Sequence, residues 1–440
     1  MAADKLVDST QLNTDLTSVA NAIRTKGGTS ESLAFPAGFV SAIEAIPSGG
    51  GGGVATPNDV NFYDYDGTIV DSYSAADFAQ LSALPSNPSH DGLTAQGWNW
   101  SLSDAKTHVA TYGKLNIGQM YATSDGKTRL YIHLGQGRLA PYLGLAVNGT
   151  ATVDWGDNSA TSTVTGSNTT TVINTQHTYA TPGDYVISIA VSGNAALLGS
   201  NSYGSQVLWK NSTTGDQNLC YQTAIRAVEI GTGISIGTYA FNSCYSLTSI
   251  TIPSGVTSIG TNAFYRCYSF ANITIPSMVT SIGDHVFNSC YSLTSITLPS
   301  GVTSIGNNAF YNCYSLTSIT IPSRVTSIGE SAFNGCYSFA SITIPSGVTS
   351  ISNYAFRSCY SLTSITIPSG VTSIGTYAFN SCYSLGEIHF KRSSPATVSR
   401  SNAWSNLPTD CIIYVPTGSL SAYTSATNYP DSSVYTYREE

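Results

Sequence analysis

The most regular feature of the chain is a pattern of apolar positions that returns every 23 residues in its C-terminal half. Within one period, Ile250 and Ile252 alternate with hydroxyl residues as in a short strand. Pro253 then ends the strand, because it cannot donate a backbone hydrogen bond, and Val256 and Ile259 make a second apolar step. One coil of this size cannot bury its own apolar lining. The pattern therefore predicts stacked coils, a solenoid, whose strands pair at about 4.8 Å.

Each period also carries a Phe, a Cys three residues later and a Tyr directly after the Cys. The unit reads A-F-x-x-C-Y-S-L-T-S-I-T-I-P-S-G-V-T-S-I-G-x-x. We expect buried thiols at these cysteines instead of disulfides or a metal site, since an odd set in a regular stack cannot pair completely and no C-x-x-C spacing occurs. The cysteines of this row are Cys244, Cys267, Cys290, Cys313, Cys336, Cys359 and Cys382.

The motif L-x-x-I-x-I-P-x-x-V-x-x-I-G-x-x-A-F-x-x-C, found over about residues 224–390, resembles the BspA-like leucine-rich repeat. The resemblance implies a leucine-rich-repeat solenoid with 23-residue coils. The chain departs from the motif at Val286, where Ala is usual, at Ser352, where Gly is usual, and in residues 225–237, where the first coil is one residue short. Residues 391–440 break the period, and we expect them to cap the end of the array.

The N-terminal segment, residues 1–47, has two short helical patterns, and a Gly-rich linker follows at 48–57. Two short helices bury little surface, so we expect this segment to attach to another protein. Its stretches L-T-S-V-A-N-A-I-R-T-K-G-G-T-S and F-P-A-G-F-V-S-A-I-E-A-I resemble the N-terminal segment of tail proteins from phages and prophages of Gram-positive gut bacteria. The resemblance implies other virion proteins as partners. The start of the chain lacks the apolar core of a secretory signal, which favours the same interpretation.

Residues 58–115 contain D-Y-D-G-T from Asp64, which resembles the D-x-D-G-T motif of haloacid-dehalogenase phosphatases. That chemistry would also require a later acidic pair for Mg²⁺ and a Lys for the phosphate on a doubly wound sheet, and no Asp-Asp pair follows. The alternative is a strand from Phe62 and a hairpin turn at Asp66-Gly67. The segment F-Y-D-Y-D-G-T, with the later H-D-G-L-T and G-W-N, resembles the Listeria-Bacteroides repeat, which implies a small β-grasp-like module.

Alternating apolar residues in the segment 116–198 predict the strands of a β-sandwich. The stretches V-D-W-G-D and H-T-Y-A-T-P-G-D-Y resemble motifs of the polycystic-kidney-disease domain, which implies an Ig-like fold with Trp155 in its core. We expect Asp154 and Asp157 to accept hydrogen bonds from turn amides. The alternative is a Ca²⁺ ion held by these carboxylates and Asp184, and no other cofactor is expected.

The composition agrees with a multidomain, mainly β chain, in which a connector at 199–223 precedes the solenoid. The 440 residues suffice for about three domains, and only 10% of them are charged, with a net charge of -8.

No Lys/Arg cluster is present, so nucleic acid is not an expected partner. No apolar stretch approaches the roughly 18 residues of a membrane span, so no membrane insertion is expected. No histidine lies beside a plausible nucleophile, and we expect no catalytic residues and no enzyme activity.

The candidate ligand face lies between the inward isoleucines of the strands. Its hydroxyl rows carry no charge, so they could hydrogen-bond sugars or another uncharged polymer, and an ice lattice is a weaker alternative. A second candidate is the Tyr beside each Cys. Tyr offers a flat face and a polar tip, but stacked Tyr also stabilise solenoids, and both roles stay open here. The two sets of positions are Ser249, Thr251, Thr274, Ser295, Thr297, Ser318, Thr320, Ser341, Thr343, Ser364 and Thr366, and Tyr245, Tyr268, Tyr291, Tyr314, Tyr337, Tyr360 and Tyr383.

Together these patterns predict a non-enzymatic adhesion protein of a phage or prophage tail, in a fibre, tail tip or baseplate. The solenoid would bind carbohydrate or protein on the host surface, and the virion would assemble in the bacterial cytoplasm. The alternatives are a bacterial cell-surface adhesin of the BspA-like type and a capsid-decorating fibre. Self-association into a homo-oligomer is compatible with each of them.

Overall fold

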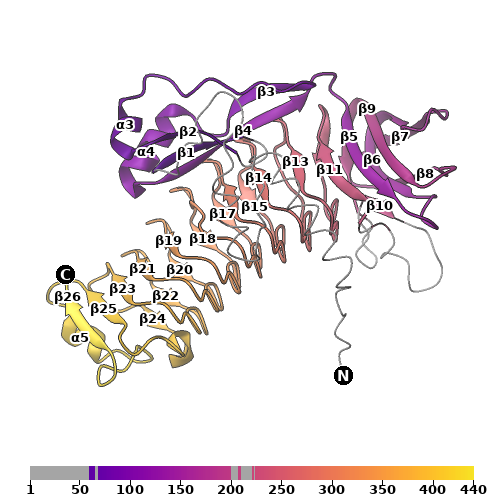
Figure 1. Cartoon of the computed structure of the whole chain (residues 1–440). Coiled ribbons are helices and arrows are strands. Elements are labelled where there is room, and N and C mark those ends of the chain that lie inside the picture. The colour runs from indigo at the N-terminus through magenta and orange to yellow at the C-terminus, as the bar shows by residue number, and fades with distance from the viewer. Residues whose placement is uncertain (1–58, 65–67, 200–206, 210–220, 222) are drawn as a thin grey trace, which may run out of the picture. The chain divides into compact units, whose positions relative to one another are not determined.

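The computed structural model describes residues 59–64, 68–199, 207–209, 221 and 223–440, all within one compact unit, Pro57–Glu440 (Figure 1). The expected N-terminal helices, the Gly-rich linker, the turn at Asp66-Gly67 and most of the connector lie outside the described residues. The described part is mainly β with few helices. It contains a β-solenoid of about nine turns with coils of about 23 residues, as the repeat pattern predicts.

The first part of the described chain is a four-stranded sheet with two helices, called the small module below. Its strands lie in the order β2-β1-β4-β3, with β1 and β4 parallel and the two outer pairs antiparallel. Phe62, Phe78 and Trp98 belong to its own apolar core. The elements are β1 (Val60–Tyr63), β2 (Ile69–Tyr73), α3 (Ala75–Gln80), β3 (Leu93–Trp98), α4 (Leu102–Tyr112) and β4 (Leu115–Thr123).

Both helices of the small module begin at a serine. The hydroxyls of Ser74 and Ser101 accept hydrogen bonds from the backbone N–H groups of Asp77 and Asp104, which leaves two fewer unpaired donors at the helix starts. Helix α4 ends at Gly113, whose φ of 77° is the left-handed conformation that terminates helices. This turn fixes the start of β4.

The second part is an antiparallel sheet that continues into the solenoid. Strand β9 pairs with β5 and β6, and β6 also pairs with β7, β8 and β10. The first coil then joins this sheet, since β11 pairs antiparallel with β5 and β12 pairs parallel with β9. The first coil is therefore capped by backbone hydrogen bonds. These elements are β5 (Thr128–Leu134), β6 (Tyr142–Asp154), β7 (Ser162–Ser167), β8 (Ile173–Gln176), β9 (Gly183–Leu197), β10 (Leu208–Trp209), β11 (Ile225–Glu229) and β12 (Ile234–Ile236).

Trp155 lies in the core beside this sheet, with 1% of its surface exposed. Its indole Nε1 donates to the Ser162 hydroxyl at 2.8 Å, and its carbonyl accepts from the Tyr179 hydroxyl at 2.9 Å. The next residue, Gly156, has a φ of 77° and lies against the backbone of Val186, so a side chain at this position would collide with the neighbouring strand. The absence of a side chain at Gly156 thus lets the turn after Trp155 pack closely against β9.

The solenoid has two rows of parallel strands, visible as successive rungs in Figure 1. Pairing joins residues 23 positions apart, such as Ser341 with Ser364 and Ser350 with Ser373. The first row comprises β13 (Ser249–Thr251), β14 (Asn272–Thr274), β16 (Ser295–Thr297), β19 (Ser341–Thr343), β21 (Ser364–Ile367), β23 (Glu387–Phe390) and β25 (Ile412–Val415). The second row comprises β15 (Ser281–Ile282), β17 (Ser304–Ile305), β18 (Ser327–Ile328), β20 (Ser350–Ile351), β22 (Ser373–Ile374) and β24 (Thr397–Val398). The outward side of the first row is called the strand face below.

Two ladders fill the interior of the coils. Phe rings of successive coils stack, for example Phe310 on Phe333 with ring centroids 5.3 Å apart. The cysteines of the row are free thiols with no exposed surface, and each from Cys267 onward donates to the Phe carbonyl of the preceding coil, as Cys313 does to Phe287 at 3.1 Å. Burial raises the pKa of these thiols well above the usual range, so they stay protonated.

The departures from the repeat motif are accommodated locally. Val286 stands where the motif has Ala and is fully buried. Ser352 stands where the motif has Gly, and its hydroxyl donates to the Ile328 carbonyl of the preceding coil at 2.6 Å. The larger side chain of Val286 is therefore packed in the core, and the hydroxyl of Ser352 is hydrogen-bonded.

The last coils end in an aromatic cap. Strand β26 pairs parallel with β25 and extends the first row. Phe390, Trp404, Tyr423 and Tyr429 pack together over the end of the core, with ring centroids 5.0 to 6.1 Å apart. The cap includes η2 (Ser401–Trp404), α5 (Leu420–Thr424) and β26 (Thr436–Glu439).

Candidate functional site

The small module packs on the strand face. The indole of Trp100 donates to the Leu298 carbonyl at 3.1 Å, and the Asn99 amide donates to the Ile275 carbonyl at 3.5 Å. Gly118 in β4 lies so close to Thr274 that any side chain would collide with it. Strand β4 contacts β13, β14 and β16, and Figure 1 shows the module beside these rungs. The module therefore covers the first coils of the strand face.

This packing divides the predicted hydroxyl rows into covered and open positions. Thr251 and Thr297 lie against the module with only 5% and 7% of their surface exposed. Farther along the solenoid, Ser341, Thr343 and Thr366 are exposed. The half-buried positions are Ser249, Thr274, Ser295, Ser318, Thr320 and Ser364. The surface available to a large ligand is thus the part of the strand face from residue 341 onward, called the open strand face below.

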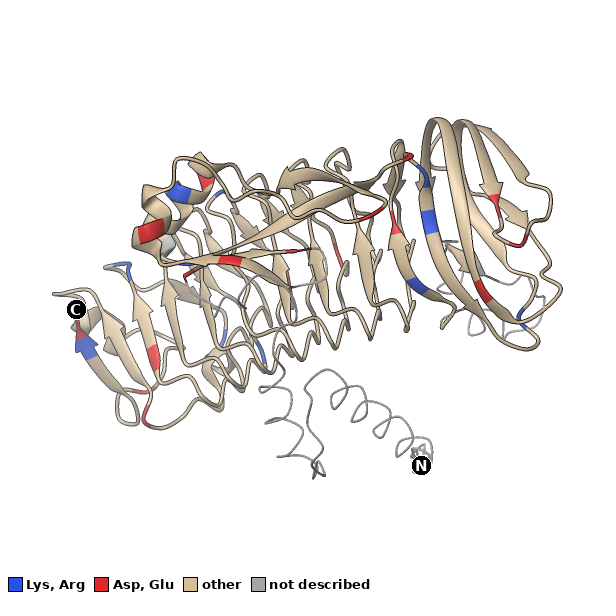
Figure 2. Cartoon of the chain, turned by 45° about the horizontal axis from the view of Figure 1, so that its top comes forward, with Lys and Arg blue, Asp and Glu red and all other residues tan. Residues whose placement is uncertain are grey.

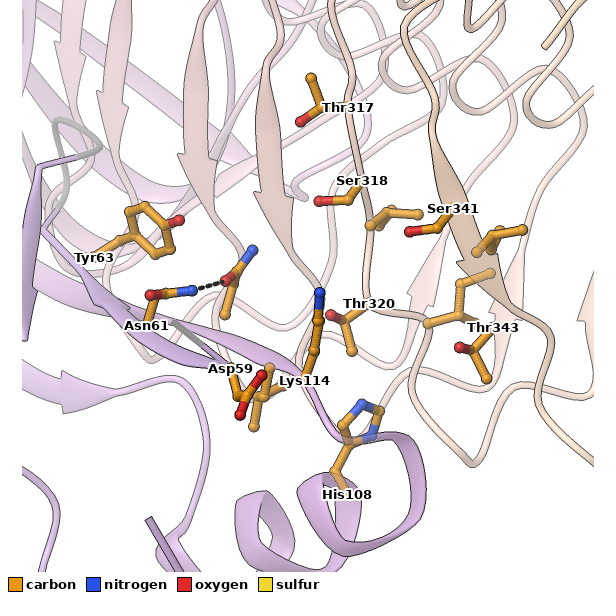
Figure 3. Close-up of a pocket in the computed structure, with 15 residues that line it drawn as sticks. Asp59, Asn61, Tyr63, His108, Lys114, Thr317, Ser318, Thr320, Ser341 and Thr343 are labelled. Atoms are coloured by element: carbon orange, nitrogen blue, oxygen red, sulfur yellow. Dashed lines mark hydrogen bonds between the residues drawn. The ribbon is translucent and has the colours of Figure 1, made fainter. Parts of the chain in front are cut away.

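A cavity of about 380 Å³ lies between the small module and the strand face, where the covered coils give way to the open ones (Figure 3). The module contributes charged, amide and aromatic side chains to this cleft, and the solenoid contributes mainly hydroxyls and isoleucines. The polar residues that line the cleft are Asp59, Asn61, Tyr63, His108, Lys114, Asn116, Thr317, Ser318, Thr320, Ser341 and Thr343.

Hydrogen bonds hold part of the module side of the cleft in place. The Ala75 N–H at the start of α3 donates to Asp59 Oδ2 at 3.0 Å. The Asn61 amide donates to Asn116 Oδ1 at 3.2 Å, the bond drawn in Figure 3, and Asn61 Oδ1 accepts from the Ser72 hydroxyl at 2.8 Å. These side chains are therefore oriented before any ligand arrives.

The cleft carries two opposite charges. Asp59 is the acidic residue and Lys114 is the basic one, and Figure 3 shows the Lys114 side chain extending into the cleft. Burial lowers the pKa of His108 to about 4, so this ring, which packs on Trp100 with centroids 5.0 Å apart, is neutral at pH 7. At neutral pH the lining has no net charge. Figure 2 shows that charged residues are also sparse along the coils.

The Tyr ladder stacks ring on ring along the array. Successive rings from Tyr245 to Tyr360 are nearly parallel with centroids 4.5 to 4.7 Å apart, and Tyr383 follows at 5.1 Å with a tilt of 32°. Burial, with neighbouring rings as the smaller cause, raises the pKa of Tyr268 and Tyr314 to about 12. The flat faces of the inner rings are covered by their neighbours. Inner rings can offer a ligand only edges and hydroxyls.

Asp64, from the phosphatase-like motif, is 7% exposed in the small module. Its Oδ2 lies 2.7 Å from His90 Nε2, and its Oδ1 accepts from the Tyr121 hydroxyl at 3.0 Å. Both carboxylate oxygens thus have side-chain partners within the module. The second aspartate of the motif, Asp66, lies outside the described residues.

The three carboxylates considered for Ca²⁺ have separate partners. Asp154 Oδ1 accepts from the Gly156 N–H at 3.0 Å, and Asp157 Oδ1 accepts from the Ser159 N–H at 3.1 Å. Asp157 Oδ2 lies 2.7 Å from His177 Nε2, whereas Asp184 Oδ1 lies 2.8 Å from His133 Nδ1. Within the part of the chain that the structure describes, no group of three or more His, Cys, Asp or Glu side chains could hold a metal ion.

Among the residues that the structure describes, no helix combines the length and the apolar character needed to cross a bilayer.

Sequence reasoning identified the strand face but missed the module side of the cleft. Asp59, Asn61, Lys114 and Asn116 lie about 200 to 280 residues before the coils that complete the site, and no local motif marks them. The repeat sequence does not indicate which coils the small module covers, because covered and open coils share the same motif. Only the packing of the module brings the two sides together.

Comparison with known proteins agrees with the solenoid. Residues 213–337 and 303–417 match the family described as the BspA type leucine rich repeat region, with six copies. The chain therefore contains a region of BspA-type leucine-rich repeats. No curated protein is significantly similar to it in sequence.

Several solved leucine-rich-repeat structures are similar to part of the chain. A leucine-rich repeat protein from Bacteroides ovatus is 23% identical, with a TM-score of 0.34, over 52% of this chain and 75% of that one. The leucine rich repeat protein of T. pallidum is 27% identical, with a TM-score of 0.31, over 51% and 89%. A leucine rich cell surface protein from Faecalibacterium prausnitzii is 22% identical, with a TM-score of 0.27, over 56% and 91%.

Proposed function

We propose that the chain is a non-enzymatic adhesion protein of a phage or prophage virion, associated with the tail, whose solenoid binds carbohydrate or protein on the host surface. The observation that carries the proposal is the open strand face. Its exposed hydroxyls, among them Ser341, Thr343 and Thr366, stand on a parallel ladder at about 4.8 Å per coil. On the coils that carry these hydroxyls, an uncharged polymer can bind without breaking ion pairs, whereas on β23 the same row positions are the ion-paired Glu387 and His389.

The virion assignment is supported by the resemblance of residues 1–47 to the N-terminal segment of phage tail proteins. In this proposal that segment docks on other virion proteins. The small module would be a β-grasp-like unit of the Listeria-Bacteroides type, supported by its mixed sheet with the parallel central pair β1 and β4. The next unit would be a polycystic-kidney-disease domain, supported by the packing of Tyr179 on the Trp155 turn.

The non-enzymatic part of the proposal is supported by the surroundings of Asp64. A nucleophilic aspartate needs a carboxylate that can reach a substrate, whereas Asp64 is buried and bonded to His90 and Tyr121. We expect Asp64→Asn to leave turnover of a generic phosphate ester at background. A measurable turnover in the native chain that the substitution abolishes would contradict this part of the proposal.

Immunogold labelling tests the virion assignment. An antibody raised against the repeat array, residues 240–385, would be applied to purified particles from the bacterium that carries the gene and to the same cells before lysis. We expect label at the tail of the particles. Label confined to the cell surface, with none on any particle, would overturn the assignment and favour the cell-surface adhesin.

A further inference from the structure

We infer that the cleft between the small module and the solenoid is a binding site for an uncharged saccharide chain, which continues from the cleft along the open strand face. The inference rests on the proposed adhesive function and adds the ligand class and the position of the site.

The cleft has the size and shape of a ligand site. Its volume of about 380 Å³ falls within the range of about 300–1,000 Å³ that is common for small-molecule sites. It also lies between two parts of the chain that have separate apolar cores, and ligand sites often occur at such boundaries. Part of its module side is oriented by the bonds of Asp59 and Asn61 described above, which lowers the entropy lost on binding.

The lining offers both donors and acceptors. Lys114 supplies donors, the Asp59 carboxylate supplies acceptors, and the amides and hydroxyls supply both. Each hydroxyl of a sugar can likewise donate one hydrogen bond and accept others, so this mixture suits a saccharide. A phosphate or carboxylate ligand would instead favour an excess of cationic donors. The opposite charges of Asp59 and Lys114 and the neutral His108 give no such excess.

The floor of the cleft extends out of it as a regular surface. Ser341 and Thr343 line the cleft, and in-register pairing places Ser364 and Thr366 on the next coil in the same rows. The spacing of coils, about 4.8 Å, is close to the rise per residue of an extended polysaccharide. A chain that leaves the cleft along these rows would meet the same pair of hydroxyls on the next coil, before Glu387 and His389 take the two row positions on β23.

Calorimetric titration of the full chain tests the ligand class directly. The uncharged probes are cellohexaose, maltohexaose and hexa-N-acetylchitohexaose, and the charged probe is hexagalacturonate. We expect at least one uncharged probe to bind about tenfold more tightly than hexagalacturonate. If no uncharged probe binds, or if hexagalacturonate binds more tightly than all three, the inference is wrong.

Matched substitutions test the position of the site. Ser341→Trp fills the floor of the cleft, whereas Ser350→Trp places the same bulk at an exposed serine of the second strand row in the same coil. We expect Ser341→Trp to weaken binding by at least about tenfold and Ser350→Trp to change it by less than about twofold. Equal effects of the two variants, or no effect of Ser341→Trp, would overturn the inference.

A smaller substitution separates a loss of binding from a loss of folding. Lys114 is exposed directly before β4, so Lys114→Gln should leave the thermal unfolding midpoint unchanged. It removes one charged donor from the cleft and should weaken binding of the uncharged probe by about threefold to tenfold. Unchanged binding by this folded variant would exclude Lys114 from the site and contradict the proposed lining.

Binding to host cells separates this inference from the proposed function. If the native chain binds cells and Ser341→Trp binds them equally well, adhesion stands and the saccharide cleft fails. If the native chain binds no host cell, the adhesive function itself fails, whatever the oligosaccharide titrations show.

Discussion

The Tyr ladder provides a test of what holds the coils together. Tyr314 lies inside the ladder, stacked on Tyr291 at 4.7 Å and on Tyr337 at 4.6 Å. Tyr383 ends the ladder, with one tilted neighbour at 5.1 Å and 55% of its surface exposed. Replacing each with Ala therefore removes two close stacking contacts in the first case and one weaker contact in the second.

The expected magnitudes follow from these contacts. An aromatic pair contributes about 0.5–1.5 kcal/mol beyond the area it buries. Tyr314→Ala should thus lower the free energy of unfolding by about 2–3 kcal/mol, including lost burial, and Tyr383→Ala by about 1 kcal/mol or less. Tyr314→Phe keeps the stacked ring and loses only the hydroxyl, so it should cost less than about 0.5 kcal/mol.

The assay is urea unfolding of the full chain at neutral pH, monitored by circular dichroism. The variants can be compared when they share the same m-value, the slope of the unfolding free energy against urea concentration. Equal losses for Tyr314→Ala and Tyr383→Ala would refute the stacking argument. So would a loss for Tyr314→Phe as large as that for Tyr314→Ala. If Tyr314→Phe kept its stability and lost cell binding, the hydroxyl edge of the ladder would be a receptor contact.

Three further predictions concern titratable groups that are buried or half-buried. The pKa values of Tyr268 and Tyr314 are raised from 10 to about 12, so the stability that they contribute should be complete below pH 10 and fall as the pH rises toward 12, which urea midpoints across this range would show. The pKa of His108 is lowered from 6.5 to about 4, so stability should be complete above pH 6.5 and fall by about 2–3 kcal/mol as the pH drops toward 4. His108→Phe should flatten this acid dependence, and an unchanged slope would show that His108 is not its source. Cys313 and the other thiols of its row should resist iodoacetamide in the native chain and react only at the rate of unfolding; rapid labelling of the folded protein would contradict their burial.

The solenoid could be predicted because the fold repeats a local pattern. The 23-residue period set the strand positions, and Ile250 and Ile252 face the core as the alternation indicates. The hydroxyl rows of the strand face follow from the same alternation. Every coil repeats this evidence, so a local departure such as Ser352 did not obscure it.

The cleft could not be predicted, because it depends on how two parts of the chain pack. Thr297 and Thr343 occupy the same position of the repeat, yet one is buried by the small module and the other is exposed. The close approach of Gly118 to Thr274 could not be predicted from the sequence, since a Gly within a strand marks a bulge or a bend as often as a close contact. The first coil is one residue short in the sequence, but its pairing with β5 and β9 could not be predicted, because it depends on residues about 40 to 100 positions away.

Cell binding by two matched variants tests the central claim that the open strand face is the adhesive surface. Thr366→Arg places a charge on that face outside the cleft, and Thr349→Arg places the same charge at an exposed threonine beside the second strand row. The account predicts that Thr366→Arg lowers the affinity of the full chain for host cells by about tenfold or more, while Thr349→Arg stays within about twofold of the native chain. Equal binding by the two variants, or a larger loss for Thr349→Arg, would contradict it.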